Sequence, residues 1–421
     1  MKMKKLNVLL SAYACNPSSS AKLHPGEDIK GWRFVEQISR FHNVWVISHS
    51  YNRNSIVAAL YNNPLRGVEF IFVTLPRIFR LLYKVDFGQR IYYYLWQIKA
   101  WRVARKIHKK IPFNIFHHVS FGNDWMPSFI GALLPIPFVW GPLGGGQKTP
   151  RCLRREYSLY GRFAETMRSV AQFVGRKDYF RQKCLKKAKA ILVCNQETRN
   201  LIPQKYSCRI HWFPLNGIFP SDLRKSPECF KRHSPFRVIT AGRLHRLKGF
   251  GLAIRAFKLF AEKYPDVEFL IVGSGPERRR LERQISQFGL AAKVKIQPWA
   301  QRKDLLRLFC LSDVFLFPSF RDGGGAVVVE AMACGKSIVC LDVGGPGFHV
   351  QEQWGIKIEP KSVDYIVNQI VEALGALYKD NDRLIKKGKA AVERAEDYYL
   401  ADRLGERLQK IYACSLDSRL S

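Results

Sequence analysis

The sequence predicts two doubly wound α/β domains in succession, each built on a parallel sheet with helices on both faces. The chain has 421 residues, of which 47% are hydrophobic, so two ordinary domains can each bury a core. Short apolar, β-branched runs alternate with longer segments of helical periodicity, which favours parallel sheets. Turn-forming and charged residues gather at 214–235. We therefore expect a first domain over 1–213, a second over 214–395 and a terminal segment over 396–421.

The predicted elements begin at the amino terminus. Residues 1–15 have a basic head and an apolar stretch, but this stretch is short and contains Asn7, so we expect a buried first strand rather than a signal peptide. The apolar spacing at 251–265 and 276–289 predicts helices, and 398–412 has the pattern of an amphipathic helix. The runs expected to form further strands are 44–48, 68–73, 238–242, 267–275, 294–297, 314–319 and 337–345.

Several features argue against other classes of protein. Residues 125–146 carry no charge, but Pro135, Pro137 and Pro142 interrupt them, so no membrane-spanning helix is expected there. The ten cysteines show neither a CxxC pair nor zinc-ligand spacing, which indicates reduced thiols in a cytoplasmic protein. Residues 380–382 have the D-x-D spacing of a metal motif but follow a helix-like run, so we expect a solvated turn and no metal site.

The chain is strongly basic, with 69 Lys and Arg residues against 34 Asp and Glu and a formal net charge of +35. Such a charge predicts attraction to an anionic membrane surface, phosphorylated substrates or nucleic acid. The excess gathers in two insertions of the first domain, 74–110 with ten basic and eight aromatic residues and 151–190 with twelve basic residues. Along 74–110, Tyr93 and Trp96 share a helical face flanked by cations. That face either docks on an anionic bilayer or packs its aromatics into the domain core.

Glycine turns follow two of the predicted strands. One strand ends at Gly242 and is followed by Arg243 and Lys248, and open α/β sheets bind ligands at such ends. Two cations there would stabilise the negative charge of a departing nucleoside diphosphate, and the alternative is a pair of solvated surface cations. The turn at 270–277 contains Gly273 and resembles either half of a dinucleotide fingerprint or a tight turn without a ligand.

The most specific stretch is PSFRDGGGAVVVEAMACGKSIV, residues 318–339, in which Asp322 and Glu330 stand eight residues apart. Three successive glycines follow the aspartate, although glycine costs about 1 kcal/mol at a helical position. They expose backbone amides at a helix amino terminus, which is a site for phosphate. Glu330 is placed to accept hydrogen bonds from ribose hydroxyls, and Asp322 lies at the mouth, near a sugar. The glycines are Gly323, Gly324 and Gly325.

With these motifs in register over roughly residues 236–350, the second half resembles the donor domain of family 4 glycosyltransferases, which are retaining enzymes of the GT-B fold. The resemblance implies two Rossmann-like domains facing a cleft, with the last helix crossing back onto the first domain. It implies a nucleoside-diphosphate sugar as donor, no metal and no other cofactor. The family usually has glutamate where this chain has Asp322, which leaves the identity of the sugar open.

The resemblance also assigns roles to the motif residues. Arg243 and Lys248 stabilise the departing diphosphate, and the glycine amides after Asp322 help to hold phosphate or sugar. Glu330 holds the ribose, and Asp322 holds the sugar. In a front-face displacement the leaving phosphate itself receives the proton of the acceptor, while domain closure excludes water.

In the first half, a histidine pair ends a predicted strand. The family often has a histidine at this position that contacts the transferred sugar. His118 corresponds to it, with His117 as the alternative register. A histidine whose ring is satisfied by structural hydrogen bonds is the competing interpretation.

Two glycine-containing loops are expected on the same side of the cleft. Gly26 and Glu27 follow the first strand, where such enzymes have a glycine loop near donor and acceptor. Residues 140–150 hold three successive glycines, of which Gly144 and Gly145 are expected to face the cleft. A plain turn is the alternative for the second loop.

Taken together, the motifs and the resemblance predict a retaining hexosyltransferase that moves a sugar to a saccharide or lipid-linked saccharide. The basic insertions favour an acceptor at the inner face of the cytoplasmic membrane, in capsule, exopolysaccharide or lipopolysaccharide synthesis. The alternatives are a catalytically inactive GT-B scaffold, a polyanion-binding protein and a sugar-nucleotide epimerase. Nucleic acid is not the expected partner, because its binding would leave residues 318–339 unexplained.

Overall fold

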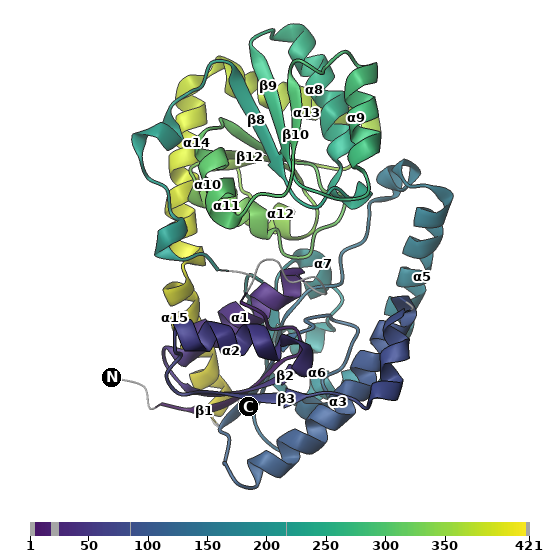
Figure 1. Ribbon diagram of the computed structural model, residues 1–421, viewed down its shortest axis with the longest axis vertical. Coiled ribbons are helices and arrows are strands. Elements are labelled where there is room, and N and C mark those ends of the chain that lie inside the picture. Colours follow the sequence, from purple (N-terminus) through teal and green to yellow (C-terminus); the bar gives the residue numbers. More distant parts are fainter. Residues whose placement is uncertain (1–4, 18–24, 85, 216, 418–421) are drawn as a thin grey trace.

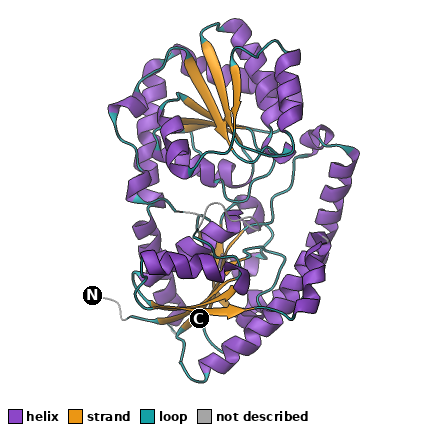
Figure 2. Cartoon of the chain, viewed as in Figure 1, coloured by secondary structure: helices purple, strands orange, loops and turns teal. Residues whose placement is uncertain are grey.

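The computed structural model describes residues 5–17, 25–84, 86–215 and 217–417, and it contains two sheets, each with helices on both sides (Figures 1 and 2). The first sheet has seven strands in the order β3-β2-β1-β4-β5-β6-β7, and the second has six in the order β10-β9-β8-β11-β12-β13. All pairings between neighbouring strands are parallel. In each sheet the strand order reverses once, between β1 and β4 and between β8 and β11, which is where doubly wound sheets bind ligands.

The first domain has seven strands with helices between them along the chain. Its strands are β1 (Asn7–Ala12), β2 (Asn43–His49), β3 (Val68–Val73), β4 (Ile115–Ser120), β5 (Phe138–Leu143), β6 (Ala188–Val193) and β7 (Ile210–Trp212). Its α-helices are α1 (Pro25–Ser39), α2 (Arg53–Asn62), α3 (Asp86–His108), α4 (Phe129–Leu133), α5 (Leu159–Arg176), α6 (Tyr179–Lys187) and α7 (Gln196–Arg199). Short 3₁₀ turns are η1 (Ser50–Asn52), η2 (Arg77–Lys84), η3 (Arg151–Glu156) and η4 (Gln204–Arg209).

The second domain repeats the same alternation more compactly. Its strands are β8 (Phe236–Ala241), β9 (Val267–Val272), β10 (Val294–Gln297), β11 (Val314–Phe317), β12 (Ser337–Leu341) and β13 (Gly355–Ile358). Its α-helices are α8 (Phe250–Lys263), α9 (Arg278–Gln287), α10 (Arg302–Cys310), α11 (Ala326–Ala333), α12 (Gly344–His349), α13 (Val363–Lys379) and α14 (Asn381–Arg394). Shorter turns are η5 (Pro220–Asp222), η6 (Pro227–Phe230) and η7 (Arg246–Lys248), and a π-turn, η8 (Ala395–Tyr399), follows α14.

The apolar runs expected to be strands all overlap strands of the two sheets, including the first run as β1. Such runs are almost continuously apolar because helices cover both faces of a parallel sheet, so successive side chains are buried on opposite sides. In β11 all four residues are buried, and in β8 all but Arg237. The core of each domain therefore lies on both sides of its sheet.

The chain passes between the domains twice, and the two passages lie side by side. The Ile218 amide donates to the Tyr399 carbonyl, and the Ala401 amide donates to the Ile218 carbonyl, both over 2.8 Å. The last helix, α15 (Ala401–Leu416), then packs against the first domain, where Leu404 and Tyr412 join the core around β1 and β2 (Figure 1). The carboxyl-terminal helix is therefore part of the first domain's core.

The two basic insertions adopt different structures. The first forms η2 and α3, and Tyr92, Tyr93 and Trp96 are buried in the core of the first domain. The bilayer-facing alternative is therefore wrong for these aromatics, and the core-facing alternative is confirmed. The second insertion forms η3, α5 and α6, and α5 runs along one side of the molecule, apart from both sheets (Figure 1). Within the described parts of the chain, no helix is long and apolar enough to span a membrane.

Candidate functional site

The loops that leave β8 and β11 meet because these two strands are neighbours in the second sheet. Gly249 ends η7 with φ +70°, and a β-carbon there would lie 2.0 Å from the Pro318 carbonyl oxygen. Only glycine allows this approach, since the backbone conformation and the contact both exclude a side chain. The approach brings Lys248 on the first loop next to Asp322 on the second.

An ion pair joins the Lys248 ammonium to Asp322 Oδ2, and both side chains are partly buried. The other carboxylate oxygen, Oδ1, accepts the Gly324 amide at 3.0 Å and the Gly325 amide at 2.7 Å. Burial acts to raise the pKa of Asp322, but Lys248 and the two amides outweigh it and hold the pKa below its ordinary value of 3.8. Asp322 is therefore an anion at neutral pH, and the predicted cation, acid and glycines form one cluster.

The three glycines after Asp322 are explained by close contacts within the protein. A β-carbon on Gly323 would lie 3.0 Å from Gln147 Nε2, and one on Gly324 would lie 2.3 Å from Leu215 Cδ1. Gly325 begins α11 in the left-handed region, with φ +55°. The amides predicted to hold phosphate or sugar are bonded to Asp322 in this state, so a ligand would have to share or displace that carboxylate.

Arg243 is the one predicted cation that stays uncommitted. Its side chain is exposed, and no partner for it is found within the described part of the chain. The neighbouring glycines serve packing: the Gly242 amide donates to Val272 and the Gly273 amide to Gln297, and a β-carbon on Gly273 would lie 1.9 Å from the Gly242 carbonyl oxygen. The tight-turn interpretation of 270–277 therefore accounts for Gly273, and the amides of Gly242 and Gly273 are both already bonded.

Glu330 lies in α11 and is paired with an arginine that the sequence analysis missed. Arg302 binds Glu330 Oε1 and also holds both carboxylate oxygens of Asp222, at 3.1 and 2.9 Å. Burial acts to raise the pKa of Asp222, but Arg302 outweighs it and lowers that pKa below 3.8. Arg302 follows the end of β10 by five residues, so the signal was again a cation beyond a strand end.

The first domain contacts the glycine loop through residues that the sequence analysis did not select. The Gly323 carbonyl accepts hydrogen bonds from Asn195 Nδ2 at 2.9 Å and Cys194 Sγ at 3.2 Å. Nearby, Glu197 Oε1 accepts the Gly344 amide at 2.6 Å. These residues follow β6 directly, so polar residues after a buried strand were the available signal.

Neither predicted histidine reaches the surface of a cleft, because both lie within β4 and are fully buried. His117 is satisfied on both ring nitrogens, by the Tyr412 hydroxyl at 2.7 Å and the Gly141 carbonyl at 2.8 Å. His118 Nε2 lies 3.4 Å from the Tyr93 hydroxyl. Burial lowers the pKa of each histidine to about 3, so both are neutral at physiological pH. The structure thus shows no cleft-facing histidine here. The structural alternative fits His117, whereas Nδ1 of His118 is buried without a hydrogen-bond partner among the described residues.

The first turn of α1 carries Gly26 and Glu27, as a loop-to-helix junction after β1. Glu27 Oε2 lies 3.3 Å from Lys30 Nζ, whose side chain is only 1% exposed. Burial chiefly raises the pKa of Cys194, to about 12. Lys30 acts to lower this pKa, whereas Glu27 and Asp322 of the other domain act to raise it. Charges from both domains therefore act on Cys194.

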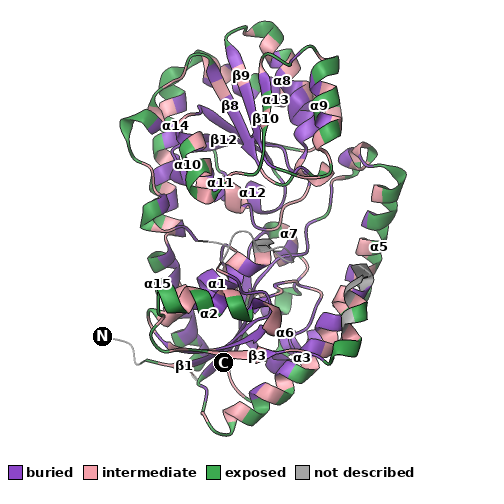
Figure 3. Ribbon diagram, viewed as in Figure 1, coloured by how far each residue is buried: buried purple, intermediate pink, exposed green. Residues whose placement is uncertain are grey.

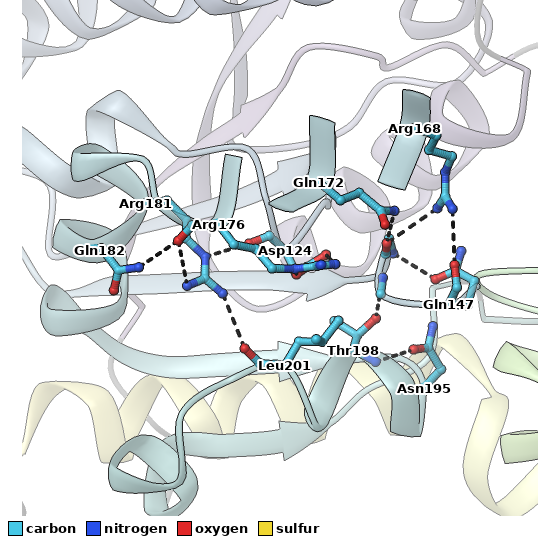
Figure 4. A network of polar contacts seen from close by, with 12 residues as sticks. Asp124, Gln147, Arg168, Gln172, Arg176, Arg181, Gln182, Asn195, Thr198 and Leu201 are labelled. Carbon is cyan, nitrogen blue, oxygen red and sulfur yellow. Dashed lines mark hydrogen bonds and ion pairs between the residues drawn. The ribbon is translucent and has the colours of Figure 1, made fainter. Parts of the chain in front are cut away.

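The loop with Gly144 and Gly145 is held by side chains of α5 (Figure 4). Gln172 Nε2 donates to the Gly145 carbonyl over 2.7 Å, and the Gly145 amide donates to Gln147 Oε1 over 2.9 Å. The Gly144 amide is bonded to the Gly122 carbonyl at 2.7 Å. This loop places Gln147 against Gly323, so it lies between α5 and the donor-side loop.

Acidic and histidine side chains do not gather into a metal site anywhere in the described ranges. In the D-x-D stretch, Asp380 caps α14 by accepting the Arg383 amide at 2.8 Å, so it serves the helix end.

Comparison with known proteins finds a family match in the second domain. Residues 224–391 match the family described as "Glycosyl transferases group 1". The chain is 31% identical over 190 residues to D-inositol 3-phosphate glycosyltransferase of Paenarthrobacter aurescens, covering 44% of this chain and 46% of that protein. It is 27% identical over 198 residues to a phosphatidylinositol N-acetylglucosaminyltransferase chain of Homo sapiens, covering 47% and 40%. The chain thus spans less than half the length of these curated relatives.

Solved structures match the chain over almost its whole length. A glycosyltransferase from Rickettsia africae covers 99% of this chain and 100% of its own, with TM-score 0.65 and 16% identity. Anabaena HepE, solved with UDP and glucose, covers 97% and 99%, with TM-score 0.61 and 15% identity. WaaG, a glycosyltransferase involved in lipopolysaccharide biosynthesis, covers 96% and 99%, with TM-score 0.60 and 16% identity. These likenesses confirm the GT-B fold, and the family match confirms the glycosyltransferase resemblance of the second domain, while family 4 stays a prediction.

Proposed function

We propose that the chain is a retaining glycosyltransferase that moves a sugar from a nucleoside diphosphate to an acceptor hydroxyl. One observation carries the proposal: Lys248, Asp322 and the amides of Gly324 and Gly325 meet at the carboxyl edge of the second sheet. This edge faces the first domain, and the group 1 family match covers the same domain. HepE, which has a similar fold, was solved with UDP and glucose.

The leaving group would be stabilised by Arg243 and Lys248. Arg243 is exposed with no partner in the described ranges, so a diphosphate can approach it without breaking an ion pair. Lys248 is already held by Asp322, and a diphosphate beside it adds a second anion while the carboxylate turns to a sugar hydroxyl. Arg243 and Lys248 would supply the positive charge that a metal supplies in other glycosyltransferases, so we propose a metal-independent reaction. The leaving phosphate takes the proton of the acceptor in a front-face displacement.

The nucleoside would be held at Glu330. Its Oε1 is paired with Arg302, which leaves Oε2 for the ribose hydroxyls. The contacts of Asn195 and Cys194 with the Gly323 carbonyl tie the donor loop to the first domain. Opening the domains would break these bonds and admit the donor, and closing would restore them and exclude water.

We propose a saccharide or lipid-linked saccharide as the acceptor, in synthesis of capsule, exopolysaccharide or lipopolysaccharide at the inner face of the cytoplasmic membrane. One relative is named as a phosphatidylinositol N-acetylglucosaminyltransferase, and WaaG is described as involved in lipopolysaccharide biosynthesis. The net charge of +35 supports a reaction at an anionic membrane surface. A sugar-nucleotide epimerase is the nearest alternative, and it would change the donor with no acceptor present.

Nucleotide binding is the test of the proposed site. Thermal shifts are measured with UDP, GDP, ADP and their sugar conjugates on the wild type, Lys248→Ala and Glu330→Gln. Lys258→Ala is the matched control, because Lys258 is a lysine of the neighbouring helix α8 that is also paired with one carboxylate, Glu262. Stabilisation by one nucleotide, lost in both site variants and kept in the control, supports the proposal. Stabilisation that survives in both site variants would place the donor elsewhere and contradict it.

A further inference from the structure

Helix α5 exposes an apolar stripe to solvent. Its members recur at spacings of three and four residues, so they share one face of the helix. Each is more than half exposed, and Figure 3 shows this helix as largely exposed along its length. They are Leu159, Phe163, Met167, Val170, Phe173 and Val174. A surface helix of a globular protein has the opposite arrangement, with its apolar face on the core.

The inward face of α5 is polar and fixed to the protein. Arg176 Nε binds Asp124 Oδ2 at 2.7 Å, and Gln172 donates to the loop carbonyl of Gly145 (Figure 4). Glu165 binds Arg321, the residue before Asp322 in the donor loop. The helix therefore cannot bury its apolar stripe by rolling over without breaking these bonds, and the stripe stays exposed for a partner.

Exposed cations lie in α5 and at the segments that begin and end it, and the acids nearby are engaged inward. The exposed basic residues are Arg151, Arg155, Arg162 and Lys177. All three acids of 151–178 have internal partners: Glu156 binds Arg255, Glu165 binds Arg321, and Asp178 accepts the Tyr94 hydroxyl. The outer face of the insertion thus combines apolar side chains with uncompensated positive charge.

We propose that α5 is a membrane-docking helix that lies in the interface of an anionic bilayer, with its apolar stripe among the acyl chains and its cations at the lipid headgroups. The proposal specifies how the chain would reach the membrane location given under the proposed function. It rests on that function only for the reason why the chain would need to bind a membrane. A second copy of the chain fits the stripe less well, because two such faces would bring like charges together in a protein of net charge +35. Docking places the Gly145 loop and Arg321, which α5 holds, beside the lipid surface.

The test is co-sedimentation with vesicles of phosphatidylcholine, alone or with phosphatidylglycerol, using the full chain and no sugar nucleotide. The docking variant is Phe163→Ser with Phe173→Ser, which removes two aromatics that face solvent. The control is Val57→Ser with Tyr61→Ser, an exposed apolar pair on α2. We expect the wild type and the control to bind the anionic vesicles, and the docking variant to partition into them roughly tenfold less or weaker still.

Binding of the wild type and the docking variant to anionic vesicles in equal amounts would overturn the proposal, as would absence of binding by the wild type. A wild-type dimer in sedimentation velocity that the docking variant abolishes, without vesicle binding, would assign the stripe to a second copy instead. Equal melting temperatures of all three proteins exclude misfolding as the cause of lost binding. Nucleotide thermal shifts on the same variants report the donor site separately, so failure of docking and failure of the proposed transfer give different results.

Discussion

Candidate catalytic residues were predicted at two strands, β4 and β11, and the structure places them in opposite environments. His117 and His118 lie inside β4, a strand whose residues are all buried, and both rings are neutral. Asp322 lies five residues beyond the end of β11 and meets Lys248 at the edge of the sheet. A residue within a covered parallel strand points into a core, and one beyond its carboxyl end points to the ligand crevice.

The comparison teaches that distance past the strand end decides function more than residue type does. Histidine at β4 is chemically as suitable for a sugar contact as aspartate at β11. Its position in the strand gives it the Tyr412 hydroxyl and the Gly141 carbonyl as partners instead. The buried pair therefore supports stability, and the exposed-edge pair is available for chemistry.

The largest expected effect is loss of Lys248. Lys248→Ala removes a cation aimed at the leaving diphosphate, so we expect donor turnover to fall by roughly a hundredfold to a thousandfold, about 3–4 kcal/mol in the transition state. The free energy of unfolding should change by less than about 1 kcal/mol, because the Lys248–Asp322 pair is only partly buried. Donor hydrolysis and urea unfolding measure the two effects. Turnover equal to that of Lys258→Ala would contradict the assignment.

His117→Leu should show the reverse pattern. It leaves the Tyr412 hydroxyl and the Gly141 carbonyl unpaired in a dry core, so we expect the free energy of unfolding to fall by about 2–3 kcal/mol. The nucleotide dissociation constant should not change. Tyr412→Phe alone and together with His117→Leu completes a double-mutant cycle in urea unfolding. If His117→Leu weakens nucleotide binding without lowering the free energy of unfolding, this histidine would have to be assigned to the active site.

The pH dependence of stability distinguishes the two strand ends further. The unfolded chain protonates each histidine near pH 6.5, whereas burial lowers the folded pKa of His117 and of His118 to about 3. The unfolded state therefore binds more protons between these values, and stability falls on acidification by about 1.4 kcal/mol per pH unit for each histidine. Asp322, whose pKa is also lowered, loses its contribution only below about pH 3.8. The free energy of unfolding, measured in urea at pH 7 and pH 5, should therefore fall on acidification. In His117→Leu the fall should be smaller by the contribution of one proton.

Periodicity predicted the fold well because a doubly wound sheet requires a regular pattern of apolar residues along the sequence. Each buried strand is an apolar run, and each covering helix repeats its apolar residues every three or four positions, so five strands of the second domain and its helices α8 and α9 were found close to their bounds. The Lys248, Asp322 and glycine cluster was predictable for the same reason, since neighbouring strand ends meet at one edge.

Contacts between distant segments were not predictable. Arg302 with Glu330 joins α10 to α11, and Asn195 with Gly323 joins the loops that follow β6 and β11, and no local pattern encodes either contact. Composition also failed to separate α3 from α5. Both segments are basic and carry aromatics, yet α3 buries Tyr93 and Trp96 while α5 exposes Phe163, because the partners on each inward face decide the orientation of the helix.

The smallest expected effect probes the departure from the family pattern. Asp322→Glu adds one methylene group to a carboxylate that now accepts the Gly324 and Gly325 amides and binds Lys248. The longer arm can keep the lysine but moves past the amides, so we expect the free energy of unfolding to change by less than about 1 kcal/mol. The carboxylate would then meet a different hydroxyl of the donor sugar, and the ranking of sugar donors should shift by roughly tenfold. Competition between two sugar conjugates of the preferred nucleotide measures the shift. An unchanged ranking would mean that Asp322 fixes the loop and Lys248 but does not select the sugar. Its role would then be structural, like that of His117.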